Sequence, residues 1–135
     1  MRTIYLSLLL WIIASPVTAA EISFTSPSGN IRCQIQDTVV ANARCDLDVT
    51  RQSFTERPAS CDGVWGTSFA VLLTGPGIVN CATRTIARDG VATILPYGAS
   101  ISFAGIICRS EEVGMICTNE DGGGFSIRRA EQRVY

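Results

Sequence analysis

Six cysteines constrain the fold of this chain more than any other feature of its sequence. Two segments that carry a cysteine, residues 31–35 and 45–49, alternate apolar and polar side chains as a strand with one buried face does. If the two are neighbouring antiparallel strands with Cys33 opposite Cys45, their apolar side chains all lie on one side, and a slip of one residue would turn one set outward. In this register the facing neighbours are Ile31 with Leu47 and Ile35 with Ala43. The pattern therefore predicts a disulfide between Cys33 and Cys45.

A second hairpin repeats this plan. Residues 106–108 and 115–117 each end on a cysteine and flank a polar connection. Gly114 can supply the positive φ that closes a four-residue turn between them. This arrangement places Cys108 opposite Cys117 and predicts a second disulfide.

By elimination the last two cysteines, Cys61 and Cys81, form the third disulfide. Metal ligation is the alternative, but the spacing contains no C-x-x-C pair and the chain has no histidine to complete a zinc site. An even number of cysteines in an exported chain is typical of a disulfide framework, which persists in an oxidising compartment.

The N-terminal segment predicts a signal peptide over residues 1–20. A positively charged start precedes a run over 4–13 that is apolar except for one serine, and small residues suit cleavage after Ala19 or Ala20. An N-terminal membrane anchor is the alternative, but a helix needs roughly 18 to 20 apolar residues to span a bilayer. We therefore expect a single periplasmic or secreted domain over residues 21–135, with no membrane span after cleavage.

The rest of the chain has the pattern of short strands separated by turns. Alternating or apolar runs are bounded by glycine, proline and asparagine, and single helical turns are conceivable only at 51–56 and 128–132. About eight or nine short strands at this length are typical of a sandwich or a small barrel. The expected fold class is all-β, a single small β-sandwich or barrel held by three disulfides.

Charge and composition exclude several classes of function. The chain has 11 basic residues against 12 acidic ones and no histidine, and loss of Arg2 with the signal peptide leaves a net charge of about −2. A nucleic-acid-binding domain carries a basic patch, so no nucleic-acid partner is expected. Without a histidine or a free thiol, neither a Ser-His-Asp nor a Cys-His arrangement can form. We predict no catalytic residue, no cofactor and no metal.

Carboxylates are the remaining candidates for catalysis. They form three close pairs: Asp46 with Asp48, Glu111 with Glu112, and Glu120 with Asp121. A hydrolase of this kind needs one carboxyl that is buried enough to raise its pKa. Most of the chain's acids are expected in turns or on polar strand faces that are exposed to water, so alanine at each of these six should barely change stability. A carboxylate-dependent hydrolase is therefore kept only as an alternative. Residues 119–121 could hold calcium weakly, but they lack the alternating ligands of a calcium loop.

Several short motifs together resemble a family of small secreted bacterial domains of unknown function. They lie throughout the mature chain: SPSGNIRC at 26–33, RCD at 44–46, CD at 61–62, LPYG at 95–98, GMICTN at 114–119, GFS at 124–126 and the closing Tyr135. The resemblance implies export and a single domain. It implies no particular activity.

Aromatic side chains beside turns are the candidates for binding a partner. Trp65 and Tyr97 both lie next to turn residues, and aromatic residues often anchor partners. Trp65, four residues after a cysteine, has the alternative of packing on the disulfide. We expect a non-catalytic binding or interaction module with a protein or glycan partner. A structural component of the envelope is a further alternative.

Overall fold

The computed structural model describes residues 12–15, 20–86 and 93–135. Within these residues the fold is all-β, with eleven strands and no helix, as the short alternating runs predict. The strands are β1 (Ala20–Thr25), β2 (Ile31–Asp37), β3 (Asn42–Leu47), β4 (Ser68–Leu72), β5 (Ile78–Val79), β6 (Thr93–Ile94), β7 (Ser100–Phe103), β8 (Ile106–Glu111), β9 (Gly114–Thr118), β10 (Gly124–Arg128) and β11 (Glu131–Val134).

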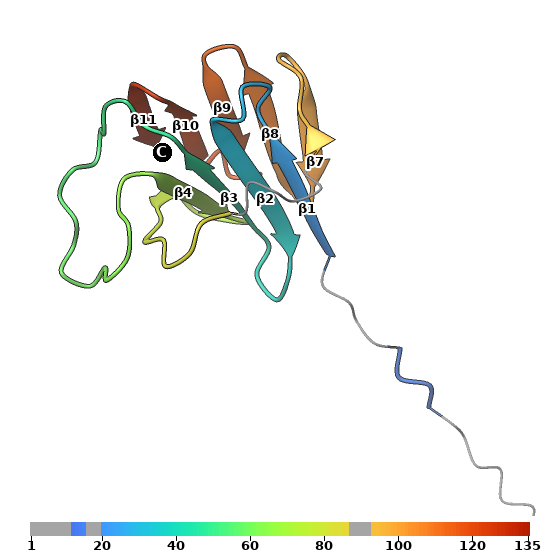
Figure 1. Cartoon of the computed structure of the whole chain (residues 1–135). Helices are drawn as coiled ribbons and strands as arrows, with labels where there is room; N and C mark the ends of the chain where they lie inside the picture. The colour runs from blue at the N-terminus through green and yellow to red at the C-terminus, as the bar shows by residue number, and fades with distance from the viewer. Residues whose placement is uncertain (1–11, 16–19, 87–92) are drawn as a thin grey trace, which may run out of the picture.

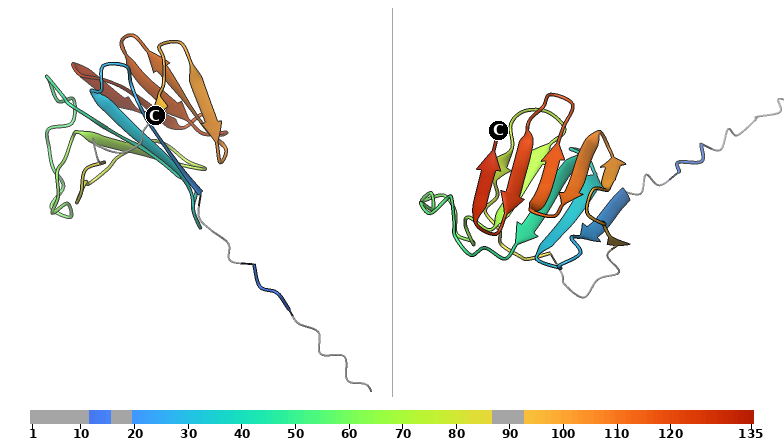
Figure 2. Two further views of the ribbon diagram at one scale, coloured as in Figure 1. Left: turned by 45° about the vertical axis from the view of Figure 1, so that its right-hand side comes forward. Right: turned by 90° about the horizontal axis from the view of Figure 1, so that it is seen from above.

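The strands form two sheets that pack face to face (Figure 1). Over the described chain, sheet 1 has the strand order β5-β4-β3-β2-β1-β6, and sheet 2 has the order β11-β10-β9-β8-β7. Strand β6 runs parallel to β1, whereas the other neighbours are antiparallel. Figure 2 shows the two layers from two further sides. The expected single β-sandwich is confirmed, and the barrel alternative is not the one adopted.

The core lies between the two sheets and takes its side chains from both. Phe24 and Phe69 of sheet 1 and Phe125 and Met115 of sheet 2 are fully buried. The rings of Phe69 and Phe125 meet across the sandwich with their centroids 6.4 Å apart and tilted by 46°, an arrangement that aromatic pairs favour. The apolar half of each alternating strand thus explains why the sheets pack on each other.

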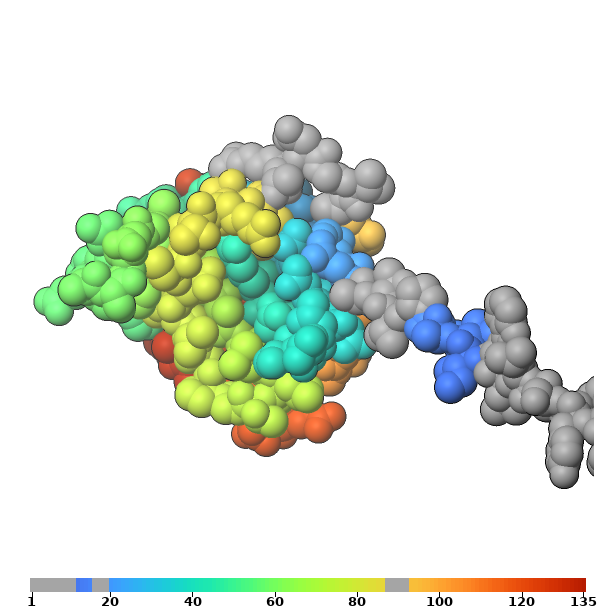
Figure 3. Space-filling view, turned by 90° about the horizontal axis from the view of Figure 1, so that it is seen from below, coloured from blue at the N-terminus to red at the C-terminus, as the bar shows by residue number. Residues whose placement is uncertain are grey.

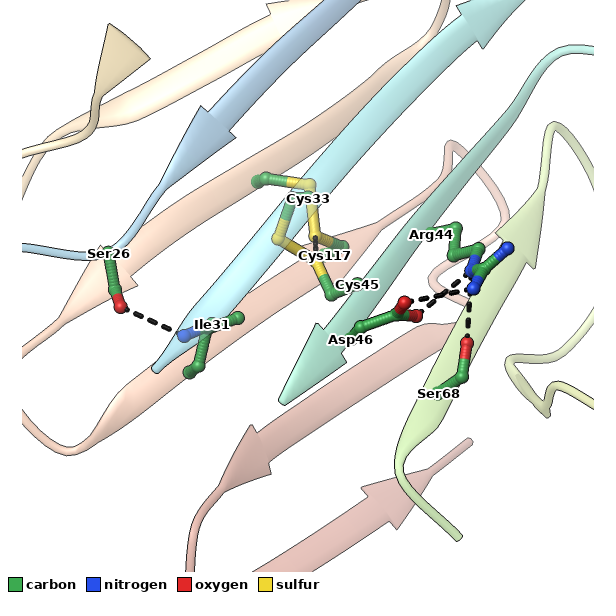
Figure 4. Close-up of a disulfide and its surroundings, with 9 residues drawn as sticks. Ser26, Ile31, Cys33, Arg44, Cys45, Asp46, Ser68 and Cys117 are labelled. Carbon is green, nitrogen blue, oxygen red and sulfur yellow. Dashed lines mark hydrogen bonds and ion pairs between the residues drawn. A yellow bond between two sulfur atoms is a disulfide. The ribbon is translucent and has the colours of Figure 1, made fainter. Parts of the chain in front are cut away.

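All three predicted disulfides are present. Cys33 pairs with Cys45 and Cys108 with Cys117, each across two neighbouring antiparallel strands with a Cα–Cα distance of 4.1 Å. The predicted register is confirmed, since Ile31 lies opposite Leu47 and Ile35 opposite Ala43. The third disulfide joins Cys61 to Cys81. Figure 4 shows the Cys33–Cys45 bond on the inner face of sheet 1, with Cys117 of sheet 2 beside it.

The prediction for Gly114 is wrong. The hairpin has a two-residue turn at 112–113, because β8 continues to Glu111 and pairs there with Gly114 as the first residue of β9. Gly114 does not have a positive φ. Instead, a Cβ at this position would clash with the backbone oxygen of Ile127 on β10. The glycine is required by the close approach of two strands and not by the turn.

The two conceivable helical turns are also not formed. Residues 128–132 are the end of β10, a tight turn and the start of β11. Residues 51–56 belong to a long connection between β3 and β4, which extends to one side of the sandwich in Figure 1. Gln132 fixes this connection to β11, because its side chain accepts a hydrogen bond from Ser53 N at 2.8 Å and donates to Arg51 O at 3.1 Å.

The expected signal peptide falls mostly outside the described residues, which include only 12–15 and Ala20 of that segment. Strand β1 begins at Ala20, next to the expected cleavage position. None of the described residues forms a helix with the length and apolar character needed to cross a membrane.

Candidate functional site

Four connections between strands meet at one end of the sandwich. They are residues 26–30 between β1 and β2, 95–99 between β6 and β7, 112–113 between β8 and β9, and 129–130 between β10 and β11. This end of the sandwich lies along the upper edge of the molecule in Figure 1. Side chains from all four line one cleft of about 270 Å³, which we call the loop-end cleft.

Tyr97 is the aromatic side chain of the loop-end cleft and is 48% exposed. Its backbone is fixed by the turn in which it lies. Gly98 adopts a φ of 84° and donates from its N–H to Ser110 O at 2.7 Å, and Ala99 N donates to Pro96 O at 3.0 Å. Tyr97 is therefore presented to solvent from a hydrogen-bonded turn and not from a free loop.

The opposite wall of the cleft is built by the turn between β1 and β2. The buried hydroxyl of Ser26 accepts a hydrogen bond from Ile31 N at 3.2 Å, and Ser26 O accepts from Gly29 N at 2.9 Å. Gly29 has a φ of 74°, a conformation that glycine adopts without strain. The SPSGN run thus forms a compact turn that places Ser28 and Asn30 on the cleft.

Charged side chains of both signs complete the cleft: Glu111, Glu112, Arg128 and Arg129. Glu111 makes an ion pair with Arg109 at 3.1 Å. Arg128 contacts Glu131, and Arg129 donates to Asp48 O at 3.3 Å. The cleft therefore carries fixed donors and acceptors and has no strong excess of either charge.

A second groove, of about 360 Å³, adjoins the loop-end cleft on the outer face of sheet 2. Glu111, Val113, Gly114 and Arg128 line both. Glu131 lies in this groove, and its pKa is lowered mainly by a hydrogen bond from Arg133 and to a smaller extent by one from Arg128. Partial burial raises the pKa of the Tyr135 phenol at the far end of the groove.

The model of the DUF6636 family, described as a family of unknown function, matches residues 4–135. The chain belongs to this family. No curated protein and no solved structure matches it. The family match agrees with the resemblance noted in the sequence at the level of a domain of unknown function.

Trp65, the second predicted aromatic, does not line the loop-end cleft. It lies half-buried in the connection between β3 and β4, where its backbone oxygen accepts a hydrogen bond from the Gln52 side chain at 3.5 Å. Its indole Nε1 is buried and has no hydrogen-bond partner in the described structure. The structure therefore does not bring Trp65 and Tyr97 together in one site.

The expectation that Asp46 lies in water is wrong. Asp46 is on the outer face of sheet 1, as its alternation with Cys45 predicts, but only 5% of it is exposed. Its two oxygens accept hydrogen bonds from Nε and Nη2 of Arg44, both at 2.9 Å, and Oδ2 also accepts from Ile86 N at 2.9 Å. Figure 4 shows this ion pair beside Ser68, whose hydroxyl accepts a further bond from Arg44.

Asn119, in the segment considered for weak calcium binding, makes hydrogen bonds that hold two connections together. Its side chain donates to Leu72 O at 3.0 Å and Gly75 O at 2.8 Å, and its Oδ1 accepts from Asp121 N and Gly123 N. The Oδ1 atom is thus already used by two backbone N–H groups. Asn119 closes the turn before β10 and joins it to the connection after β4.

Proposed function

We propose that this chain is a non-catalytic binding module that holds a glycan in the loop-end cleft. The observation that carries the proposal is the exposed Tyr97, which a rigid turn presents on the wall of a cleft formed by four separate connections. Binding sites are often built from connections that a rigid scaffold positions. An exposed aromatic ring beside polar groups is a typical anchor for a partner.

The chemistry of the cleft favours a glycan over a strongly charged ligand. The Tyr97 ring offers an apolar face on which the C–H face of a sugar can pack, while Ser28, Asn30 and Glu112 offer donors and acceptors for hydroxyl groups. Carboxylates and guanidinium groups both line the cleft, so a neutral ligand with many hydroxyl groups satisfies both. An extended polypeptide segment is the other partner that this surface could hold.

Support for a non-catalytic role comes from the surroundings of the acids in the cleft. Glu111 is held by Arg109, and Glu112 is exposed to water at the tip of the turn between β8 and β9. Neither lies in a buried apolar pocket, as the general acid of a glycoside hydrolase does. Release of cleaved glycan products by the purified protein would instead indicate a hydrolase that acts through these acids.

Disulfides support the proposed location. Three disulfides in a chain of this size are typical of an oxidising compartment outside the cytoplasm. We extend this to a periplasmic or secreted protein whose signal peptide is cleaved after Ala19 or Ala20. N-terminal sequencing of the stable protein tests the extension, and recovery of Met1 would contradict it.

A glycan array probed with the purified mature protein tests the binding role. The wild-type protein is expected to bind a defined group of glycans, and Tyr97→Ala is expected to lose this binding while it keeps its melting temperature. Tyr135→Ala is the matched control, because Tyr135 is similarly exposed (47%) but lies outside the cleft. Equal binding by Tyr97→Ala and wild type would contradict the proposal, as would release of cleaved glycan products.

A further inference from the structure

A short segment crosses the outer face of sheet 1 and covers part of it. Residues 80–86, which we call the strap, lie against the cyan strands of sheet 1 in Figure 3, where they are drawn in yellow. Arg44 and Asp46 hold the strap through Arg84 O and Ile86 N, and Asn80 donates to Ser68 Oγ at 2.9 Å. Polar side chains on this face are therefore buried by the strap instead of facing water.

A hollow of about 570 Å³ lies between the strap and the end of sheet 1. Among the described residues its lining includes Arg32 and Asp48 on one side, Thr67 on another, and Thr83 and Arg84 of the strap. We call it the strap hollow. Among the described residues, none that lines the strap hollow also lines the loop-end cleft.

Arg32 is the unusual residue of the strap hollow. It is 6% exposed and buried beside Asp46, its direct neighbour across β2 and β3. Its Nη1 donates to Gly29 O at 3.3 Å, its Nη2 lies 3.6 Å from Asp48 Oδ1, and its Nε is buried without a hydrogen-bond partner in the described structure. A buried guanidinium group with an unused N–H is costly unless something binds it.

Arg44 of β3, on the same outer face of sheet 1 as Arg32, shows what a guanidinium group in these surroundings can bind. Its Nε and Nη2 form a planar fork that binds the Asp46 carboxylate through two bonds of 2.9 Å. The same fork of Arg32 is only partly used: Nη2 forms an ion pair with Asp48 at 3.6 Å, a distance longer than a hydrogen bond, and Nε has no partner in the described structure. The Nε side of the Arg32 fork can therefore bind a further carboxylate oxygen, and no residue of the described chain occupies it.

Charge in the strap hollow also favours an anion. Asp46 forms an ion pair with Arg44, and Asp48 forms an ion pair with Arg32. Arg84 is exposed on the rim, and within the described part of the chain its guanidinium group makes no ion pair or hydrogen bond. Arg84 is thus a cation without a counter-ion among the described residues, and an entering ligand meets it first.

We propose that the strap hollow binds a carboxylate of a ligand, with Arg32 as the buried anchor and Arg84 as the rim contact. The group enters beside Arg84 and Thr83 and meets the planar fork of Arg32. A small shift of the wall accompanies binding, because Nε is closed to solvent in the free protein. The proposal is independent of the loop-end cleft and of the glycan that we assign to it.

Nuclear magnetic resonance of the intact, disulfide-bonded protein tests this site through the N–H resonance of Arg32 Nε. Loss of one arginine Nε resonance in Arg32→Lys assigns it. Galacturonate and a short peptide with a free C-terminus are expected to shift it saturably, whereas galactose and the amidated peptide leave it unchanged. The tighter of the two carboxylates identifies the source of the group, a uronic acid or a chain end.

Matched variants keep the test decisive if Arg32→Lys does not fold. Arg84→Gln changes an exposed side chain and is expected to weaken carboxylate binding by about tenfold, as loss of a charge-assisted contact does. Arg133→Gln removes an exposed arginine of sheet 2, and Tyr97→Ala alters the loop-end cleft, so both should bind the carboxylate as wild type does.

Three results would overturn the proposal. The first is an Arg32 resonance that does not move with either carboxylate, or that moves no more than with sodium chloride at the same ionic strength. The second is unchanged affinity in Arg84→Gln. The third is tighter binding of inorganic phosphate than of either carboxylate, which would replace the planar ligand by a tetrahedral anion.

Discussion

The sulfur of Cys45 in sheet 1 lies 3.9 Å from the sulfur of Cys117 in sheet 2. Both atoms are already in disulfides, so neither has a proton to donate and the contact is van der Waals packing. Each bond joins two strands of its own sheet, and the two bonds meet in the middle of the core. This contact makes the two disulfides one packed unit that holds the sheets together.

Removal of these two disulfides is therefore expected to be non-additive. Replacement of either bonded pair by alanine should lower the free energy of unfolding by about 2–4 kcal/mol. Because the bonds contact each other, the loss on removing both should differ from the sum by at least about 0.5 kcal/mol. Urea unfolding of the two double variants and the quadruple variant measures this coupling.

The Cys61–Cys81 bond provides the control for this cycle. It lies outside the core cluster to which the other four cysteines belong. Its removal together with the Cys108–Cys117 bond should therefore be additive within about 0.5 kcal/mol. Additivity in both combinations would show that the contact between Cys45 and Cys117 has no energetic weight.

Asp46→Asn is expected to destabilise the protein by at least about 2 kcal/mol, because it leaves the Arg44 guanidinium without its bidentate carboxylate in a mostly buried position. Thermal and urea unfolding measure the loss. Asp37→Asn, at an exposed position of β2, is the control and should change stability by less than about 0.5 kcal/mol. Equal stability of the two variants would mean that Asp46 does not hold the strap.

Glu131 should titrate below its ordinary pKa of 4.5, because Arg133 and Arg128 hydrogen-bond its charged form. Its contribution to stability is fully present above pH 4.5 and is lost as the pH falls through the lower folded-state pKa. Carbon NMR of the side-chain carboxyl measures this pKa. Arg133→Gln should raise it, and the distant Arg109→Gln should leave it unchanged.

Gly114→Ala is expected to cost about 1–3 kcal/mol, because the added Cβ meets the backbone of Ile127 and pushes β9 away from β10. Ser126→Ala, on the neighbouring strand, should cost less than about 0.5 kcal/mol. Urea unfolding compares the two variants. A neutral Gly114→Ala would mean that the strands can separate at this point without loss.

Register is the part of the fold that the sequence determines best. Strict alternation around Cys33 and Cys45 allows one pairing that buries every apolar side chain. Around Cys108 and Cys117 the apolar pattern is weaker, since Ile107 and Ile116 lie on the outer face of sheet 2, and the two cysteines themselves indicate the pairing. This is why two of the disulfides could be predicted directly, and the third by elimination. Gly114 shows the limit, since its role depends on the distance to a third strand.

The environment of polar residues was less predictable, because alternation tells which face a side chain is on but not what covers that face. Asp46 is on the outer face as expected, yet the strap buries it. Likewise, the loop-end cleft depends on which connections meet at one end of the sandwich, and this follows from the order of the strands. Tyr97 could be predicted as a candidate from its turn, whereas its neighbours Arg128 and Glu112 could not.

Mapping of a bound glycan by amide NMR tests the central claim most directly. The best ligand from the array is titrated into the labelled protein, and the perturbed backbone amides are located on the structure. We predict saturable shifts at residues 26–30, 97–99, 111–114 and 128–130, which surround the loop-end cleft. Shifts confined to other parts of the surface, or no saturable shift with any ligand, would contradict the account.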